Sequence, residues 1–324
     1  MSQTLNLRVV KPASTTHGLA LFAIIRNEDY FLPFFFDHYR ALGIETFLIY
    51  DDRSDAPTKD FLNAQADCAI VESDHRFGDD FGADDNGVPR RLPMILKESV
   101  PPLAFPDRWV LSVDADEFLV LPTGFSDLPQ LIRRLDDIGQ PYLTASMVDF
   151  YGPTLNHRNY DRRLNPFAAN PYFDAGPYYH WTGEARPYAM PVGLRHRLMM
   201  TMLRDHPEEI AKIYGDTAYL AKNWKIPLLK NGVGILRNGD HEISLAPSGE
   251  LSGALAHFKF HPDLDKKIAV ALGEGQYFNR SQEYAFLRTV IRFFGDADLV
   301  GPDSRTFDGA RSLEEAQLIL RATL

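Results

Sequence analysis

Cysteine is almost absent from this sequence. The 324 residues include one, Cys68, which lies in an apolar stretch. A single thiol can form neither a disulfide within the chain nor a thiolate zinc site. We therefore expect a reducing, cytoplasmic environment.

Long hydrophobic runs and an excess of basic residues are also missing. The apolar run from Leu19 to Ile25 is far shorter than the roughly 20 residues of a membrane-spanning helix, and no basic segment with a long apolar run marks a secretory signal at the N-terminus. The net charge of −10 argues against a nucleic-acid partner. We expect no transmembrane segment, although an acceptor at a membrane surface stays compatible with the sequence.

Two catalytic motifs are absent as well. No glycine-rich phosphate loop follows the first predicted strand, and Asn231-Gly232-Val233-Gly234 is too short and too late in the chain for a dinucleotide fingerprint. No Gly-x-Ser-x-Gly elbow is present, which argues against a serine hydrolase.

Apolar strands and amphipathic helices alternate through the first 113 residues. The patterns predict strands at 19–25, 46–50, 69–71 and 109–113, and helices from about 32 to 42, from Pro57 and over 89–100. This alternation predicts an α/β fold with a mainly parallel sheet.

Polar residues follow three of these strands. The clusters span Arg26–Asp29, Asp51–Asp55 and Asp114–Glu117. Because ligands of such sheets bind beyond the carboxyl ends of the strands, we expect the three clusters to share one site.

The cluster after the fourth strand is the most informative. Asp114 and Asp116 are separated by one residue, and their oxygens suit Mg²⁺ or Mn²⁺. Such an ion can neutralise a leaving diphosphate. The alternative is that the two aspartates cap a turn or a helix.

This segment resembles the Asp-x-Asp motif of GT-A-fold glycosyltransferases, in particular family 2-like enzymes. The resemblance extends over most of the chain. It includes Ala23–Glu28, Asp37–Ile44, Tyr50–Asp55, Tyr172-Phe173-Asp174 and His257-Phe258-Lys259-Phe260, of which the last two are similar to a bacterial subset.

The resemblance implies a metal-dependent transfer of a sugar, with inversion, from a nucleotide-sugar to an unidentified saccharide or glycoconjugate acceptor. A UDP-sugar is the favoured donor. The resemblance further implies a GT-A-like domain over 1–260, with a nucleotide-binding half to about 125 and an acceptor half from about 126. A C-terminal helical extension would follow over 261–324.

Several residues acquire roles through this resemblance. Asp51 and Asp52 would contact the nucleoside, and Ser54 would support the turn; an Asx-turn with a helix cap is the alternative. Other contacts to the donor would come from Arg26, Asn27, Glu28, Arg90, Arg91, Asp114 and Lys259. Of these, Arg90 and Arg91 suit a diphosphate, and Lys259 could meet a phosphate. A solvated helix entry (26–28) and a solvated arginine pair (90–91) remain alternatives.

The second half of the chain offers a third metal ligand and a catalytic base. His257, in a segment that reads as a half-buried strand over 257–260, would complete the metal site, unless it is a hydrogen-bonded structural histidine. An inverting transfer needs a base that accepts the acceptor's proton. Asp149, at the end of a strand from Leu143, ranks first, and Asp240 and His241 follow; each can instead be structural.

Other features of the second half are less decisive. The region 151–193 reads as long loops with aromatic residues (Tyr178, Tyr179, Trp181) that either stack on sugars or pack. The basic residues 195–197 either contact an anionic ligand or form the charged face of a strand. Helices are expected over 262–272, over 281–294 and from a capping box at Ser312.

Two other functions stay open. A nucleotidyltransferase also uses carboxylate-bound Mg²⁺ on an α/β sheet, and a non-catalytic carbohydrate-binding relative would keep the fold alone. The joint presence of Asp52, Asp114 and Asp116 argues against the second.

Overall fold

The computed structural model describes residues 5–83, 87, 89–155, 161–180, 188–190, 192–215, 222–244 and 251–320. The strands are β1 (Arg8–Lys11), β2 (Leu19–Ile25), β3 (Ile44–Asp51), β4 (Cys68–Glu72), β5 (Asp80–Ala83), β6 (Pro89–Arg91), β7 (Trp109–Ser112), β8 (Glu117–Val120), β9 (Tyr142–Tyr151), β10 (Tyr172–Asp174), β11 (Tyr179–His180), β12 (Tyr188–Ala189), β13 (Trp224–Lys230), β14 (Arg237–Asn238), β15 (Glu242–Ile243), β16 (Ser252–His257) and β17 (Ser304–Thr306). The helices are α1 (Leu32–Ala41), α2 (Ala56–Ala64), α3 (Leu92–Ala104), α4 (Leu128–Asp137), α5 (Pro166–Ala169), α6 (Leu194–Asp205), α7 (Pro207–Tyr214), α8 (Leu264–Glu274), α9 (Phe278–Phe294) and α10 (Ala310–Glu315).

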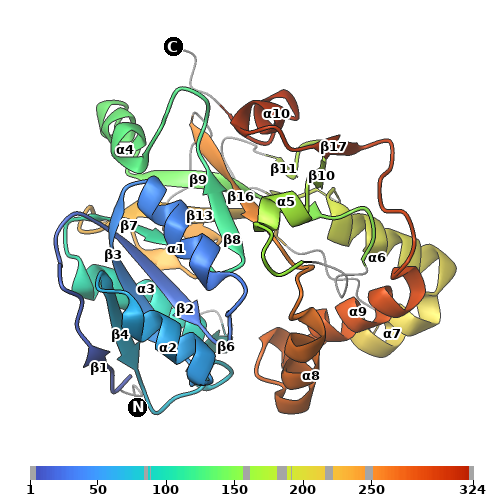
Figure 1. Ribbon diagram of the computed structural model, residues 1–324, viewed down its shortest axis with the longest axis horizontal. Helices are drawn as coiled ribbons and strands as arrows, with labels where there is room; N and C mark the ends of the chain where they lie inside the picture. Colours follow the sequence, from blue (N-terminus) through green and yellow to red (C-terminus); the bar gives the residue numbers. More distant parts are fainter. Residues whose placement is uncertain are drawn as a thin grey trace.

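A mixed sheet forms the centre of the molecule (Figure 1). Its main path runs β1-β4-β3-β2-β7-β13-β9-β10-β17, and β16 joins β9 to β8. The four neighbours β4, β3, β2 and β7 are parallel, as predicted. Strand β1 is antiparallel to β4, and β13 is antiparallel to both β7 and β9, so the parallel strands β4, β3, β2 and β7 have antiparallel neighbours on both sides. The predicted α/β class is confirmed.

Alternate side chains of β2 enter two different cores. Leu21, Ala23 and Ile25 join the core that contains α1, whereas Ala20 and Phe22 join the core that contains α3. A strand buried on both faces reads as a continuous apolar run, because successive side chains point to opposite sides of a sheet. Helices therefore cover both faces of the parallel strands, which leaves the strand ends as the place for polar groups.

The C-terminal helices form a second layer of apolar packing. Helices α6, α7, α8 and α9 share a core with Tyr151 and lie together beside the sheet (Figure 1). The chain then returns to the main core, where Leu313 and Leu318 are buried and β17 pairs with β10. The proposed division at residue 260 stays a prediction.

Four local predictions were wrong in part. The segment Pro89–Arg91 is strand β6, so its helix begins at Leu92. Strand β16 ends at His257 rather than beginning there. Helix α10 begins at Ala310, and Ser312 donates within it to Gly309 instead of forming a capping box. The region 151–193 contains α5 and β10 to β12 as well as loops.

Among the described residues, none of the helices combines the length and the apolar character that a membrane span requires.

Candidate functional site

The ends of β2 and β3 are tied together by their own polar residues. The backbone N–H of Asn27 donates to Ser54 Oγ at 3.1 Å, and Asn27 Oδ1 accepts from the N–H of Asp55 at 2.7 Å. Asp51 Oδ1 accepts from the N–H of Ser54 at 3.0 Å, three residues along the chain, whereas an Asx-turn spans two. Asn27, Ser54 and Asp51 therefore shape the two turns.

Asp52 differs from its neighbour Asp51. Its side chain is 1% exposed, with Arg26 Nη1 at 3.8 Å. The backbone N–H of Phe77 approaches it, but neither carboxylate oxygen receives a hydrogen bond of regular geometry from the described residues. Burial raises the pKa of Asp52 to about 6, and Arg26 opposes that shift. A buried carboxylate with spare acceptor capacity suits an N–H or O–H donor of a ligand.

A buried carboxylate–histidine cluster lies at the start of β8. One ligand atom each of Asp116, Glu117 and His257 falls within 4.8 Å of the others, and all three residues are buried. The register of the sheet explains this, because His257 of β16 stands opposite Glu117 of β8. The N–H of Phe258 also donates to the carbonyl of Asp116 at 2.9 Å. Two carboxylates and an imidazole are ligands that divalent ions accept, so this cluster can bind a metal ion.

The environment of Asp116 is strongly cationic. Lys259 Nζ is 3.3 Å and His257 Nε2 is 3.7 Å from its Oδ2. Burial alone would raise the pKa of Asp116, but nearby cations, Lys259 foremost and Lys267 as well, outweigh it and hold the pKa below its usual range. Asp116 is therefore ionised at neutral pH, as an anionic metal ligand would have to be.

Asp114, a predicted metal ligand, is not a member of this cluster. Lys97 Nζ is 2.7 Å from its Oδ1 and Lys225 Nζ is 2.8 Å from its Oδ2, so both oxygens already face an ammonium group. These lysines overcome the effect of burial and keep the pKa of Asp114 well below normal. Glu117, which was not among the predicted ligands, joins Asp116 and His257 in the cluster in its place.

The turn between β14 and β15 reaches this region, as the sequence suggested. Asp240 Oδ2 lies 2.6 Å from Lys97 Nζ and 3.3 Å from Lys225 Nζ. Burial is outweighed by these lysines, and the pKa of Asp240 is lowered to about 2. His241 Nδ1 contacts the carbonyl of Trp224, and burial lowers the pKa of His241 to about 4.

Asp149 is fully engaged by two neighbours. Arg195 Nε lies 2.9 Å from each of its oxygens, and His257 Nδ1 lies 2.9 Å from Oδ1. Burial alone would raise the pKa of Asp149, but Arg195 and His257 lower it below the usual range. The residue is close to the candidate metal cluster, yet it is held as an ion-pair partner.

The residues after β2 contact helix α8. Arg26 pairs with Glu274 at 2.8 Å, and Glu28 pairs with Lys267 at 2.6 Å. Burial raises the pKa of Glu28 to about 7, although Lys267 opposes it. Lys267 also helps to lower the pKa of Asp116, so its charge acts on both the end of β2 and the Asp116–Glu117–His257 cluster.

The remaining predicted residues have other partners. Arg90 pairs with Glu98, and Arg91 donates to the carbonyl of Gln276. Residues 195–197 lie on helix α6 rather than on a strand, and Arg197 pairs with Asp174 at 3.0 Å. Tyr178 is buried and donates to the carbonyl of Asp174 at 3.0 Å, so its ring packs inside the protein instead of being exposed for stacking on a sugar. The side chain of Tyr179 and all of Trp181 lie outside the described residues.

The sequence analysis did not name Lys97, Lys225 or Lys267 as site residues, although two of them carried a signal. Lys225 interrupts the apolar strand β13, and Lys97 lies on the apolar face of α3 between Leu96 and Val100. A lysine in an apolar stretch needs a buried anion, which is the clue that was available. Lys267 sits on an amphipathic helix and gave no such clue.

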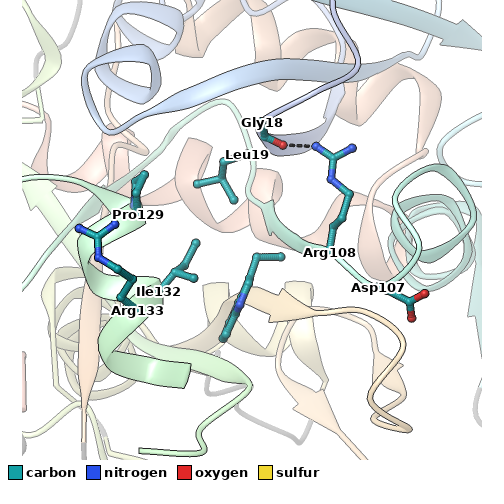
Figure 2. Close-up of a pocket in the computed structure, with 8 residues that line it drawn as sticks. Gly18, Leu19, Asp107, Arg108, Pro129, Ile132 and Arg133 are labelled. Carbon is teal, nitrogen blue, oxygen red and sulfur yellow. Dashed lines mark hydrogen bonds between the residues drawn. The ribbon is translucent and has the colours of Figure 1, made fainter. Parts of the chain in front are cut away.

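Two hollows differ in chemistry. A narrow crevice adjoins the end of β2, and its lining is of mixed charge: it includes Arg26, Lys266 and Lys267 as well as Asp29 and Asp263. An open hollow of about 440 Å³ lies at the opposite end of the sheet, where β2 and β7 begin. Figure 2 shows Leu19 there between Arg108, which donates to Gly18, and the side chains of α4. The first hollow, not the larger one, belongs to the candidate site.

Comparisons with known proteins show little similarity. No family model and no curated protein matches the chain. A solved structure of UDP-glucose pyrophosphorylase complexed with UDP-glucose shares 11% identity and covers 54% of this chain and 69% of its own, with a TM-score of 0.23. That overlap is too low to carry an argument about fold or function.

Proposed function

We propose that this protein is a metal-dependent glycosyltransferase of the GT-A, family 2-like type. It would transfer a sugar from a nucleotide-sugar, with a UDP-sugar as the favoured donor, to a hydroxyl of a saccharide or glycoconjugate, with inversion. The observation that carries the proposal is the buried Asp116–Glu117–His257 cluster at the ends of parallel strands, close to the residues that follow β2.

The charged side chains around the end of β2 and the Asp116–Glu117–His257 cluster suit a nucleoside diphosphate. Asp52 offers two unfilled acceptor oxygens to the base or ribose. Arg26, Lys259 and Lys267 supply positive charge near the place where a diphosphate would lie. Each cation is paired with a carboxylate in this structure, so donor binding would exchange a protein anion for a phosphate.

Asp116 and His257 are the residues that would hold Mg²⁺ or Mn²⁺. Glu117 is the nearest further carboxylate, although Lys225 Nζ lies 2.6 Å from its Oε1. When bound, the ion would stabilise negative charge on the departing diphosphate. Asp114, held by two lysines, would serve the donor rather than the metal.

The contacts favour the β14–β15 turn over Asp149 as the source of the catalytic base. Asp149 has both oxygens on Arg195, and a carboxylate with a depressed pKa is a weak proton acceptor. His241 has the highest pKa of the three candidates and uses Nδ1 on Trp224. We therefore assign the base to His241, with Asp240 as the second candidate.

The test is incubation with nucleotide-sugars. Thermal shifts measured with UDP-, GDP-, CMP- and dTDP-sugars, each with and without Mn²⁺, should show stabilisation by one donor only when metal is present. Chromatography should then detect release of the nucleoside diphosphate. Release or consumption of pyrophosphate would instead support a nucleotidyltransferase, and no stabilisation by any donor would contradict the proposal.

A further inference from the structure

A continuous chain of charged and hydrogen-bonding side chains runs from helix α9 to the candidate metal cluster. Glu283 Oε1 lies 2.7 Å from Arg195 Nη1, and Arg195 Nε binds both oxygens of Asp149 at 2.9 Å. Asp149 Oδ1 lies 2.9 Å from His257 Nδ1, and His257 Nε2 faces Asp116 Oδ2 at 3.7 Å. The chain thus joins α9, α6, β9 and β16.

The sheet itself places Asp149 against His257. Strands β9 and β16 are parallel, and Asp149 and His257 are partners in their register. Both residues are buried, at 4% and 3% exposure, so water does not compete for the imidazole. Arg195, also buried, keeps the carboxylate from turning away because its Nε lies on both oxygens.

We propose that Asp149 is a positioning residue that keeps His257 in the tautomer with hydrogen on Nδ1, so that an unprotonated Nε2 faces Asp116. A carboxylate can only accept a hydrogen bond, so the ring nitrogen bonded to it must carry the proton. Nδ1 lies 2.9 Å from Asp149 Oδ1, within hydrogen-bond distance, whereas Nε2 lies 3.7 Å from Asp116 Oδ2 and makes no hydrogen bond to it. The other nitrogen is then the one with a lone pair, as a metal ligand requires. Metal-binding histidines commonly donate their second N–H to a carboxylate in this way.

This inference rests on the proposed function for its purpose, since the lone pair of Nε2 matters only if an ion binds beside Asp116. Its content differs from the prediction made from the sequence, where Asp149 was the catalytic base. A base must be free to take a proton from the acceptor, whereas Asp149 is shared between an arginine and a histidine. The two roles make different predictions for the metal-free protein.

The tautomer can be measured in the wild-type protein without metal or donor. Long-range ¹H–¹⁵N correlation of ¹⁵N-histidine-labelled protein, at about pH 8.5 where an ordinary histidine is neutral, distinguishes the two ring nitrogens. The spectrum of His257→Gln assigns the signal. The expected result is hydrogen on Nδ1 and a pyridine-type Nε2. Hydrogen on Nε2 would overturn the inference.

Two variants test the consequence for metal binding. In Asp149→Asn, the amide NH₂ can donate to Nδ1 and so favour the tautomer with hydrogen on Nε2; the Kd for Mn²⁺, followed by electron paramagnetic resonance, should rise about 10–100-fold. Asp174→Asn is the matched control. Asp174 is also a buried carboxylate paired with an arginine of α6, in its case Arg197, but it does not contact His257. Its Kd for Mn²⁺ should stay at the wild-type value.

An Asp149→Asn variant that is folded by thermal melting and binds Mn²⁺ as tightly as wild type would refute the inference. If that variant does not fold, the wild-type tautomer still decides. Neither measurement uses a nucleotide-sugar. Absence of Mn²⁺ binding by wild-type protein would therefore count against the proposed function, and hydrogen on Nε2 against the role of Asp149.

Discussion

Replacement of Lys225 by methionine tests the electrostatics of the site most directly. Lys225 Nζ lies 2.6 Å from Glu117, 2.8 Å from Asp114 and 3.3 Å from Asp240, and its side chain is 6% exposed. Methionine fills similar space without charge. Lys97 still pairs with Asp114 and Asp240, but the structure shows no other ammonium or guanidinium partner for Glu117 among the described ion pairs.

The expected loss follows from the burial of Glu117. Its side chain is 1% exposed, and removal of one partner of a buried ion pair typically costs about 3–5 kcal/mol. Lys230→Met is the matched control, because Lys230 lies on the same strand and pairs with Asp136 at 2.9 Å on the surface. A half-exposed pair of that kind contributes about 0–1 kcal/mol.

The loss should also depend on pH. Burial already raises the pKa of Glu117 although Lys225 opposes the shift, and removal of Lys225 will raise it further. A carboxyl group whose folded pKa exceeds its unfolded value costs stability once the pH is above the unfolded pKa, and protonation relieves that cost as the pH falls. The penalty should therefore be largest near neutral pH and smaller at about pH 5, close to the unfolded pKa of about 4.3.

Urea unfolding followed by tryptophan fluorescence at the two pH values measures the free energy of unfolding. The difference between Lys225→Met and wild type should exceed that of Lys230→Met at neutral pH and should shrink at the lower pH. A penalty that is equal at both pH values, or no greater than that of Lys230→Met, would refute the reasoning about the buried carboxylates.

Three further predictions concern ligands and turnover. Asp116→Asn should fold but lose Mn²⁺-dependent nucleotide binding in calorimetry, as should wild type after chelation of the metal; unchanged Mn²⁺-dependent turnover would exclude Asp116 from the site. UDP affinity should increase as the pH rises through about 6, where Asp52 ionises and becomes a stronger acceptor, and Asp52→Asn should abolish that dependence; a wild-type affinity that does not vary with pH contradicts this role. His241→Ala should keep donor affinity and lose about 10²–10⁴-fold in transfer rate, with Glu242→Gln on the same hairpin as the control; a rate near that of wild type would move the base to Asp240.

The local features were the most predictable from the sequence. Strand β2 begins and ends at the predicted residues, and α1 begins at Leu32 as the position of Pro33 indicated. Both patterns depend on neighbours in the chain: an uninterrupted apolar run for a strand buried on both faces, and a proline tolerated in the first turn of a helix. A side-chain contact within the Asp51–Ser54 turn is also local, but it spans three residues and not the two of the predicted Asx-turn.

The partners of each charged group were decided only by the tertiary structure. The sequence shows that Asp114 and Asp116 are separated by one residue. It does not show that Lys97, Lys225 and Lys259 approach them from three other segments of the chain. Asp149 and His257 were both candidate site residues in the sequence, but the sequence did not show that they are in contact. That contact depends on the register of β9 with β16. Composition and periodicity act along the chain, whereas ion pairing and pKa depend on distances across it, and those exist only once the sheet has formed.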